Sequence, residues 1–155
     1  MIALSEILDT RCITLELSAT RKKHVLEELV NLLVKAGKLN LPQPKKLAKE
    51  LLAQEKLVST GIGDGVAIPH KLVEYVPETV IAFGRKQDGL NFNALDCQPV
   101  YLVFLILGPD TKPIEHLQLL SKLSRLLRND AFKKILLEAQ AADEIIEALR
   151  REEAE

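Results

Sequence analysis

Histidines are the side chains of this sequence best suited to chemistry near neutral pH, and His70 has the most unusual setting. It ends the run Ser59-Thr-Gly-Ile-Gly-Asp-Gly-Val-Ala-Ile-Pro-His70. The glycines at 61, 63 and 65 allow backbone conformations that other residues resist, and Pro69 has a fixed φ. We therefore expect a rigidly held histidine after a short buried strand, 66–68. Beside it we expect a loop rich in free N–H groups, which suits an anion such as a phosphoryl group.

The other two histidines differ in their surroundings. His24 follows Arg21-Lys22-Lys23 and is interpreted as a solvated residue on a basic helix face. His116 follows Pro113 in the first turn of a predicted helix, where unpaired N–H groups and the helix dipole favour a bound anion. If His70 and His116 meet in space, they form a pocket with two imidazoles.

A two-histidine pocket of this kind suits phosphoryl transfer. A neutral imidazole nitrogen can act as a nucleophile, and its attack on a phosphoryl donor gives a phosphohistidine. By analogy with other phosphorylated side chains, the added group carries a charge of roughly −1.5 to −2. It therefore needs hydrogen-bond donors, and the sequence offers the glycine-loop backbone, the hydroxyls of Ser59 and Thr60, and the second imidazole.

Other chemistries find less support in the sequence. The glycine spacing is not a P-loop, since no Gly-Lys-Ser/Thr follows, and it does not fit the dinucleotide-binding fingerprint. No G-x-S-x-G element indicates a serine hydrolase. A metal site built from His70, His116 and a carboxylate stays open, although no known ligand spacing occurs. A dyad of Cys97 with a histidine also stays open, with Cys97 in an ordinary turn-like context.

Predicted strands and helices alternate along the chain. The pattern predicts strands at 12–17, 66–68, 79–84 and 100–107, and helices at 21–36, 44–54, 113–128, 131–138 and 142–151. We expect 18–20 to cap the first helix and 87–89 to form a turn. The segment 100–107 is apolar on both faces, which is typical of a central strand. The order indicates an α/β sandwich in which helices cover the sheet.

Composition favours an ordinary soluble globular protein. A length of 155 residues predicts one domain over 1–155, and 47% apolar with 28% charged residues is typical of that class. The net charge of −1 gives no overall attraction to nucleic acid or anionic lipid. Cys12 and Cys97 lie far apart, so we expect reduced thiols and a cytoplasmic protein. Neither a signal peptide nor a membrane-spanning apolar stretch is visible, so we expect no direct membrane insertion.

The glycine–histidine run resembles the active-site motif of the enzyme IIA (EIIA) domains of the bacterial phosphotransferase system (PTS). The resemblance is to the fructose/mannitol/nitrogen-regulatory class of these domains. Two further segments match that family in order and spacing, so that the resemblance covers nearly the whole chain. They are the histidine-led helix His116-Leu-Gln-Leu-Leu-Ser-Lys-Leu-Ser-Arg-Leu-Leu-Arg128, and Asp88-Gly-Leu-Asn-Phe-Asn-Ala-Leu-Asp96 followed by Gln98-Pro-Val-Tyr-Leu-Val-Phe104.

This resemblance implies a mixed β-sheet flanked by helices on both faces. It implies that His70 accepts a phosphoryl group from the histidine phosphocarrier HPr, and that His116 lies beside it and hydrogen-bonds that group. The candidate phosphoryl ligands are Ser59, Thr60, Gly61 and Gly63. No metal or organic cofactor is implied. In sugar-transporting members the phosphoryl group passes to a IIB domain, whereas in nitrogen-regulatory members the phosphorylation state controls binding to other proteins.

One position departs from the family pattern. Members commonly carry Arg-Glu-Lys before the glycine loop, and here the corresponding run is Gln54-Glu55-Lys56. Glutamine can donate a hydrogen bond but lacks the positive charge. A hydrogen bond to a charged group contributes roughly 1.5–3 kcal/mol, so we expect weaker stabilisation of the phosphoryl group. Lys71 is a candidate replacement, although neighbouring residues on a strand point to opposite faces.

Two functional hypotheses follow. The first is a PTS IIA phosphocarrier, and the absence of a visible second domain or membrane segment favours its nitrogen-regulatory branch over a sugar permease component. The alternative is a binding module whose phosphorylation is impaired by Gln54. Its docking face would be the basic surface around Lys122, Arg125 and Arg128, where six basic residues stand against two acidic ones over 112–134. Because no aromatic residues are interleaved there, nucleic acid is a poor partner for this surface.

Overall fold

A mixed β-sheet forms the centre of the computed structural model, which describes residues 2–57, 61–93 and 96–154. Within these residues the sheet has six strands, in the order β1-β5-β6-β3-β2, with β4 also paired to β6. Their bounds are β1 Ile13–Thr14, β2 Gly61–Gly63, β3 Val66–Ala67, β4 His70–Val73, β5 Val80–Leu90 and β6 Val100–Pro109.

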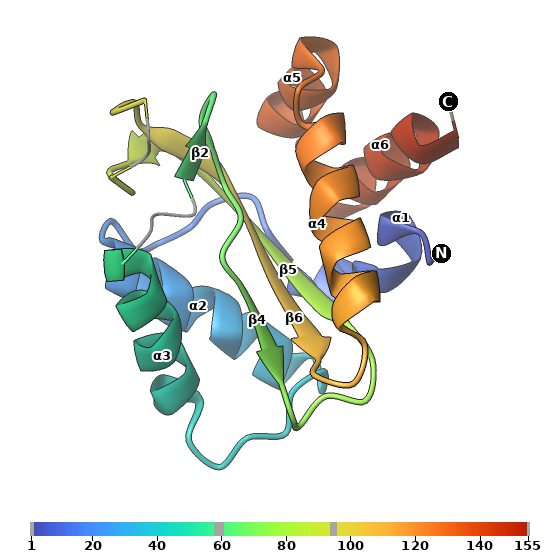
Figure 1. The fold of residues 1–155 in the computed structure, drawn as a ribbon. Helices are drawn as coiled ribbons and strands as arrows, with labels where there is room; N and C mark the ends of the chain where they lie inside the picture. Colours follow the sequence, from blue (N-terminus) through green and yellow to red (C-terminus); the bar gives the residue numbers. More distant parts are fainter. Residues whose placement is uncertain (1, 58–60, 94–95, 155) are drawn as a thin grey trace.

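Helices cover both faces of this sheet, as Figure 1 shows. On one face α2 packs against α3, and α4 lies across the other face with α1, α5 and α6 beside it. The bounds are α1 Leu4–Ile7, a 3₁₀ helix at Thr10–Cys12, α2 Lys22–Lys35, α3 Pro44–Leu57, α4 Pro113–Leu126, α5 Asp130–Glu138 and α6 Ala142–Ala154. The predicted mixed sheet flanked by helices is therefore confirmed.

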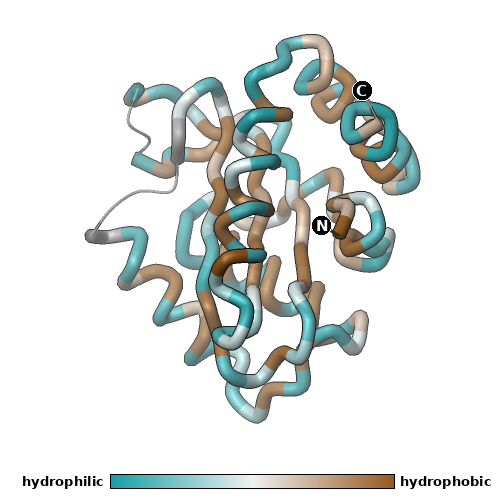
Figure 2. The backbone as a smooth tube through the Cα atoms, turned by 45° about the vertical axis from the view of Figure 1, so that its right-hand side comes forward, coloured by the Kyte–Doolittle hydropathy of each residue, from teal (hydrophilic) through white to brown (hydrophobic). Residues whose placement is uncertain are grey.

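Strand β6 is the central strand, as its apolar composition predicted. It pairs antiparallel with β5 on one side and parallel with β3 and β4 on the other. Its residues from Leu102 to Pro109 are buried, and Phe104 meets Phe83 of β5 edge to face with ring centroids 4.8 Å apart. Figure 2 shows the apolar segments gathered in the strands at the centre of the molecule. Pairing with β6 therefore fixes the position of His70 along the edge of the sheet.

Some local predictions were wrong because contacts between distant residues decided the outcome. The turn predicted at 87–89 is part of β5, where the register with β6 shifts between Arg85 and Leu90. A Cβ on Gly89 would lie 2.8 Å from Cβ of Pro99, so this glycine serves a close approach within the sheet.

The first helix and the first strand also differ from prediction. The N-cap of α2 is Arg21 and makes no side-chain cap hydrogen bond, so 18–20 do not cap it. Instead, the carboxylate of Glu28 accepts the N–H groups of Ser18 and Ala19. The strand predicted at 12–17 is reduced to β1, since Cys12 belongs to the preceding 3₁₀ helix.

Candidate functional site

His70 is the first residue of β4 and is partly exposed. It lies opposite Ile106 in the parallel pairing with β6, and the N–H of Ile106 donates to the carbonyl of Pro69 at 3.0 Å. The Nδ1 atom of His70 lies 2.7 Å from the carbonyl oxygen of Ile68. A carbonyl can only accept, so Nδ1 carries the proton. In the neutral ring, Nε2 then keeps its lone pair and is the nitrogen available as a nucleophile.

His116 lies next to His70, as the two-histidine prediction required. The two ring centroids are 5.7 Å apart, with the ring planes tilted by 52°. His116 is in the first turn of α4 and only 5% exposed. Within the described residues, its Nδ1 atom has no hydrogen-bond partner. The tertiary structure therefore brings a partly exposed and a buried imidazole to one place.

Gly108 makes the close packing of His116 against the sheet possible. A Cβ built on Gly108 would lie 2.6 Å from Nδ1 of His116, which is closer than the contacts that real Cβ atoms make. Gly108 lies near the end of β6, opposite Leu72 of β4. The sequence does not show this contact with His116, since it depends on a helix that crosses the strand end.

Burial, and then the neighbouring His70, lower the pKa of His116 below its usual value of 6.5. An imidazolium loses hydration when it is buried, and a second cationic ring close by would repel it. His116 is therefore neutral at pH 7, and a neutral imidazole can still donate one N–H to an anion.

The lowered pKa of His116 predicts a pH-dependent stability. Above about pH 7.5 both the folded and the unfolded chain hold this ring almost entirely neutral, since its usual pKa is 6.5. Below it the unfolded chain takes up a proton that the folded chain resists, so the free energy of unfolding should fall between pH 7.5 and 5.5. In His116→Gln this contribution to the slope should disappear. Urea denaturation at several pH values measures it, with exposed His24→Gln as the matched control. Equal slopes in wild type and His116→Gln would contradict the expectation.

The glycines of the motif form a tight β2–β3 hairpin. Gly61 pairs with Ala67 and Gly63 with Val66, and φ is 96° at Gly63 and 80° at Gly65. These positive values show why glycine is needed there. Ser59 and Thr60 lie outside the described residues. Their predicted role as phosphoryl ligands, like that of Gly61 and Gly63, stays a prediction.

The two residues considered for the missing arginine charge lie on or beside α3. Gln54 is exposed near the C-terminal end of this helix. The ammonium group of Lys71 lies 4.0 Å from the carboxylate of Glu50 on α3. Successive side chains of a strand alternate between faces, so Lys71 and His70 point to opposite sides of β4. Of these two positions, Gln54 is the one to alter experimentally.

The basic docking face predicted on α4 is wrong for Lys122. Its ammonium group lies 2.6 Å from the carboxylate of Glu153, and its side chain is largely buried. The outer face of α4 instead carries two apolar side chains, Ile114 at 71% and Leu117 at 65% exposure. With Arg125 they border a shallow groove of about 400 Å³. Sequence reasoning missed them, because apolar residues three and four positions apart on a helix are expected to be buried together.

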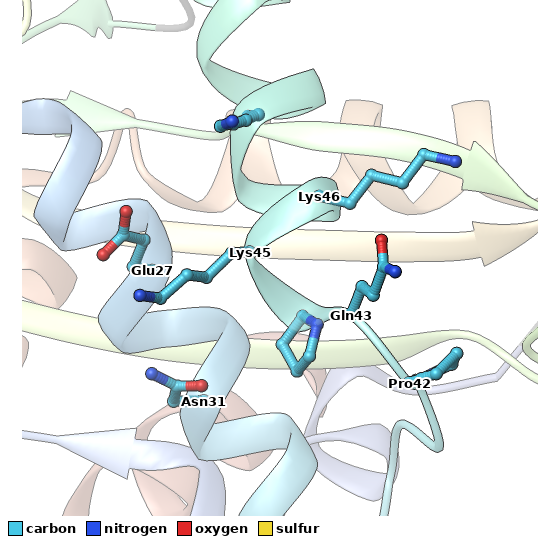
Figure 3. Close-up of a pocket in the computed structure, with 8 residues that line it drawn as sticks. Glu27, Asn31, Pro42, Gln43, Lys45 and Lys46 are labelled. Carbon is cyan, nitrogen blue, oxygen red and sulfur yellow. The ribbon is translucent and has the colours of Figure 1, made fainter.

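A second groove, of about 580 Å³, lies between α2 and α3 (Figure 3). Glu27 and Asn31 of α2 face Lys45 of α3 across it, and Lys49 of α3 also lines it. The groove is on the α2–α3 side of the sheet, whereas His70 meets His116 of α4 on the other side. It is therefore not part of the two-histidine pocket.

The described residues contain neither a cluster of metal ligands nor a membrane-spanning helix. No three His, Cys, Asp or Glu side chains gather there in a way that could hold a metal ion. Both cysteines are free thiols, Cys12 buried and Cys97 exposed. Among the described helices none has both the length and the apolar character to cross a membrane. The predicted cytoplasmic location stays a prediction.

Known proteins share both the sequence and the fold of this chain. The family model "Phosphoenolpyruvate-dependent sugar phosphotransferase system, EIIA 2" matches residues 6–152. The fructose-specific EIIABC component of Bacillus subtilis is 42% identical over 148 residues, which are 96% of this chain but 23% of that protein. The fructose-specific EIIA component of Haloferax volcanii is 34% identical, over 94% of each chain.

Two solved structures extend the likeness to three dimensions. The nitrogen regulatory protein IIA-Ntr of Neisseria meningitidis superimposes with a TM-score of 0.84 at 35% identity, over 94% of this chain and 98% of that one. The complex of mannitol enzyme IIA with phosphorylated enzyme IIB from Escherichia coli matches with a TM-score of 0.76 at 25% identity. That match covers 93% of this chain and 97% of that one.

Proposed function

The chain belongs to the EIIA 2 family of the phosphoenolpyruvate-dependent sugar phosphotransferase system, and we propose that it carries its phosphoryl group on His70. The observation that carries this proposal is the pair of imidazoles. His70 is partly exposed with Nε2 free, and a buried neutral His116 lies with its ring centroid 5.7 Å away. In this proposal His70 accepts the phosphoryl group, and His116 stabilises the phosphohistidine that forms.

In the proposed reaction, Nε2 of His70 attacks the phosphorus of a phosphohistidine on the donor protein. A new N–P bond forms and the N–P bond of the donor breaks, and the electron pair of the broken bond stays on the donor imidazole. The proton on Nδ1 of His70 stays in its hydrogen bond to Ile68. That carbonyl also stabilises the positive charge that phosphorylation leaves on the ring. No metal ion or organic cofactor takes part in this proposal.

His116 is proposed to donate an N–H to an oxygen of the phosphoryl group. Because burial keeps His116 neutral, it can lie beside the unphosphorylated His70 without repelling it. Once the phosphoryl group is attached, its negative charge favours the protonated form of His116. The interaction is therefore stronger after transfer than before, which stabilises the phosphorylated protein.

The proposed donor is a histidine phosphocarrier of the HPr type, and the proposed acceptor is a IIB domain. The solved complex with phosphorylated mannitol enzyme IIB contains a protein of this fold, which supports such an acceptor. The exposed Ile114 and Leu117, on the helix that carries His116, are suited to contact either partner. Nitrogen-type control of a target protein is the second candidate function, favoured by the likeness to IIA-Ntr.

The experiment that tests the proposal is reconstitution of phosphoryl transfer. The protein is mixed with phosphoenolpyruvate, enzyme I and HPr, and intact-protein mass spectrometry follows an acid-labile gain of one phosphoryl group. Labelled protein is then mixed with a fructose-specific IIB domain. Rapid loss of the label would support sugar transport, and retention would favour the nitrogen-type role. If the protein takes up no label while HPr is labelled, the phosphocarrier proposal is overturned and the binding-module hypothesis is favoured.

Gln54→Arg is expected to speed phosphorylation. A hydrogen bond gains strength when its donor is charged, but Gln54 is exposed, so solvent screening reduces the gain. We expect an increase of about threefold to tenfold in the initial labelling rate, corresponding to about 1 kcal/mol. Gln140→Arg adds the same charge at an exposed position between α5 and α6 and serves as the control. Equal rates in both variants would show that position 54 does not contact the reacting group.

A further inference from the structure

The tip of the β2–β3 hairpin holds three successive residues with positive φ: 96° at Gly63, 55° at Asp64 and 80° at Gly65. Glycine adopts such conformations readily, whereas a residue with a Cβ has a steric cost there. Unfavourable backbone of this kind persists where surrounding contacts hold it. The contacts around Asp64 therefore show what fixes the hairpin.

Asp96 holds the hairpin from one side. One oxygen of its carboxylate accepts the N–H of Asp64 at 3.0 Å, and the other accepts the N–H of Gln98 at 3.1 Å. These two backbone donors lower the pKa of Asp96, so the carboxylate is charged at neutral pH. A Cβ on Gly63 would lie 3.2 Å from the Asp96 oxygen that accepts the N–H of Asp64, so the glycine leaves room for this carboxylate.

Lys133 of α5 holds the same residue from another side. Its ammonium group donates to the carbonyl of Asp64 at 3.3 Å and lies 3.4 Å from the carboxylate of Asp130. The side chain of Lys133 is only 12% exposed, so most of it is covered by neighbouring residues. Both backbone polar groups of Asp64 are thus held by charged side chains from outside the hairpin.

We propose that Asp96 and Lys133 clamp the hairpin and act as positioning residues for phosphoryl transfer at His70. This inference rests on the proposed function. Asp96 is the last residue of the Asp88–Asp96 motif of the sequence. The two-histidine pocket does not account for this residue, whereas the proposed clamp does. Neither clamp residue is proposed to touch the phosphoryl group.

The clamp acts on His70 through Ile68. Strand β3 leaves the hairpin, pairs with β6 at Val66 and Ala67, and leads directly into Ile68. The carbonyl of Ile68 accepts the proton of His70 Nδ1 and so determines which ring nitrogen is free. A hairpin that is no longer held can turn this carbonyl away, and the nucleophilic nitrogen is then misplaced. Misplacement by about 1 Å can cost up to about a hundredfold in rate.

The test is phosphorylation kinetics of Asp96→Ala and Lys133→Met over a range of HPr concentrations. Both variants should lose about tenfold in the rate at saturating donor, while the KM for HPr stays unchanged. The pattern separates positioning of His70 from donor docking, because loss of docking would raise KM instead. Since both residues hold one hairpin, the double variant should lose less than the product of the two single losses.

Two variants serve as matched controls. Asp64→Gly keeps the N–H and carbonyl that the clamp uses and removes the Cβ, so it should be phosphorylated at the wild-type rate. Lys134→Met alters the next residue of α5, whose ammonium lies 4.0 Å from Glu138 and is exposed, and should also leave the rate unchanged. If Asp96→Ala fails to fold, Asp96→Asn keeps one acceptor oxygen and should show an intermediate rate.

The outcomes separate this inference from the function on which it rests. A wild-type protein that takes up no label overturns the proposed function and the clamp with it. A wild-type protein that is labelled, with Asp96→Ala and Lys133→Met labelled equally fast, overturns the clamp alone. A raised KM at an unchanged saturating rate likewise overturns it, because the two residues would then belong to the docking surface.

Discussion

Replacing His70 by alanine is expected to abolish phosphoryl acceptance while leaving the fold intact. The side chain supplies the only nitrogen that we propose as the nucleophile, so its removal leaves no atom for the new N–P bond. The structural cost is small, because His70 is partly exposed and its backbone pairing with Ile106 does not depend on the ring. The lost hydrogen bond to Ile68 costs about 1 kcal/mol.

The measurement is intact-protein mass spectrometry after incubation with phosphoenolpyruvate, enzyme I and HPr, together with circular dichroism to verify the fold. His24→Ala, at an exposed position on α2, should be labelled like wild type. His116→Ala should still be labelled, but more slowly, because it removes a stabilising donor and not the nucleophile. A folded His70→Ala protein labelled to the wild-type level would disprove the assignment of His70 as the phosphorylated residue.

Replacing Arg85 by methionine is expected to destabilise the fold by about 3 kcal/mol. Arg85 of β5 is 5% exposed, and its guanidinium donates to the carbonyls of Leu136, Leu137 and Ala139 at 2.9, 3.1 and 2.7 Å. A fourth bond, from Nε, goes to the carbonyl of Leu15 at 3.1 Å. The last carbonyls of a helix have no partner within the helix, so this one side chain satisfies the end of α5.

The size of the expected effect comes from two opposing contributions. Each buried carbonyl left without a donor costs about 1–3 kcal/mol, although relaxation and water recover part of this. The opposing contribution is the desolvation of a buried cation, which lowers the pKa of Arg85 in the folded protein. The methionine variant no longer has this desolvation cost. Nη1 shares its two hydrogens among three carbonyls, and Nε donates to the fourth. Because three N–H donors are lost and only one charge is removed, the destabilising contribution is the larger.

Urea denaturation followed by circular dichroism measures this change. Arg128→Met, at an exposed position after α4, is the control and should stay within about 0.5 kcal/mol of wild type. Arg85→Lys keeps the charge but has fewer donors, so its stability should lie between those of wild type and Arg85→Met. If Arg85→Met is as stable as Arg128→Met, the guanidinium does not hold α5 in the way described.

Most of the elements, and the glycine–histidine motif of the family, could be predicted from the sequence. The apolar spacing of Val25, Leu29 and Leu33 predicted α2, and all three are buried. Asn129, a residue type that favours helix starts, caps α5 and accepts the N–H of Phe132 at 3.2 Å. These signals depend on residues a few positions apart, and such neighbours interact in the same way wherever the segment lies in the fold. The family of the chain was evident for a similar reason, since its motifs are contiguous runs.

Only the tertiary structure decided which distant residues meet. The sequence placed His70 and His116 in separate elements and left their contact conditional, and it contained no sign that Gly108 must leave room for His116. It predicted Lys122 as part of an open basic face, whereas Glu153 of α6 binds it. Each of these outcomes depends on how a helix crosses the sheet, and that crossing is determined by packing over the whole core. Local residue patterns therefore identified the glycine–histidine motif, and the packing of helices on the sheet defined its surroundings.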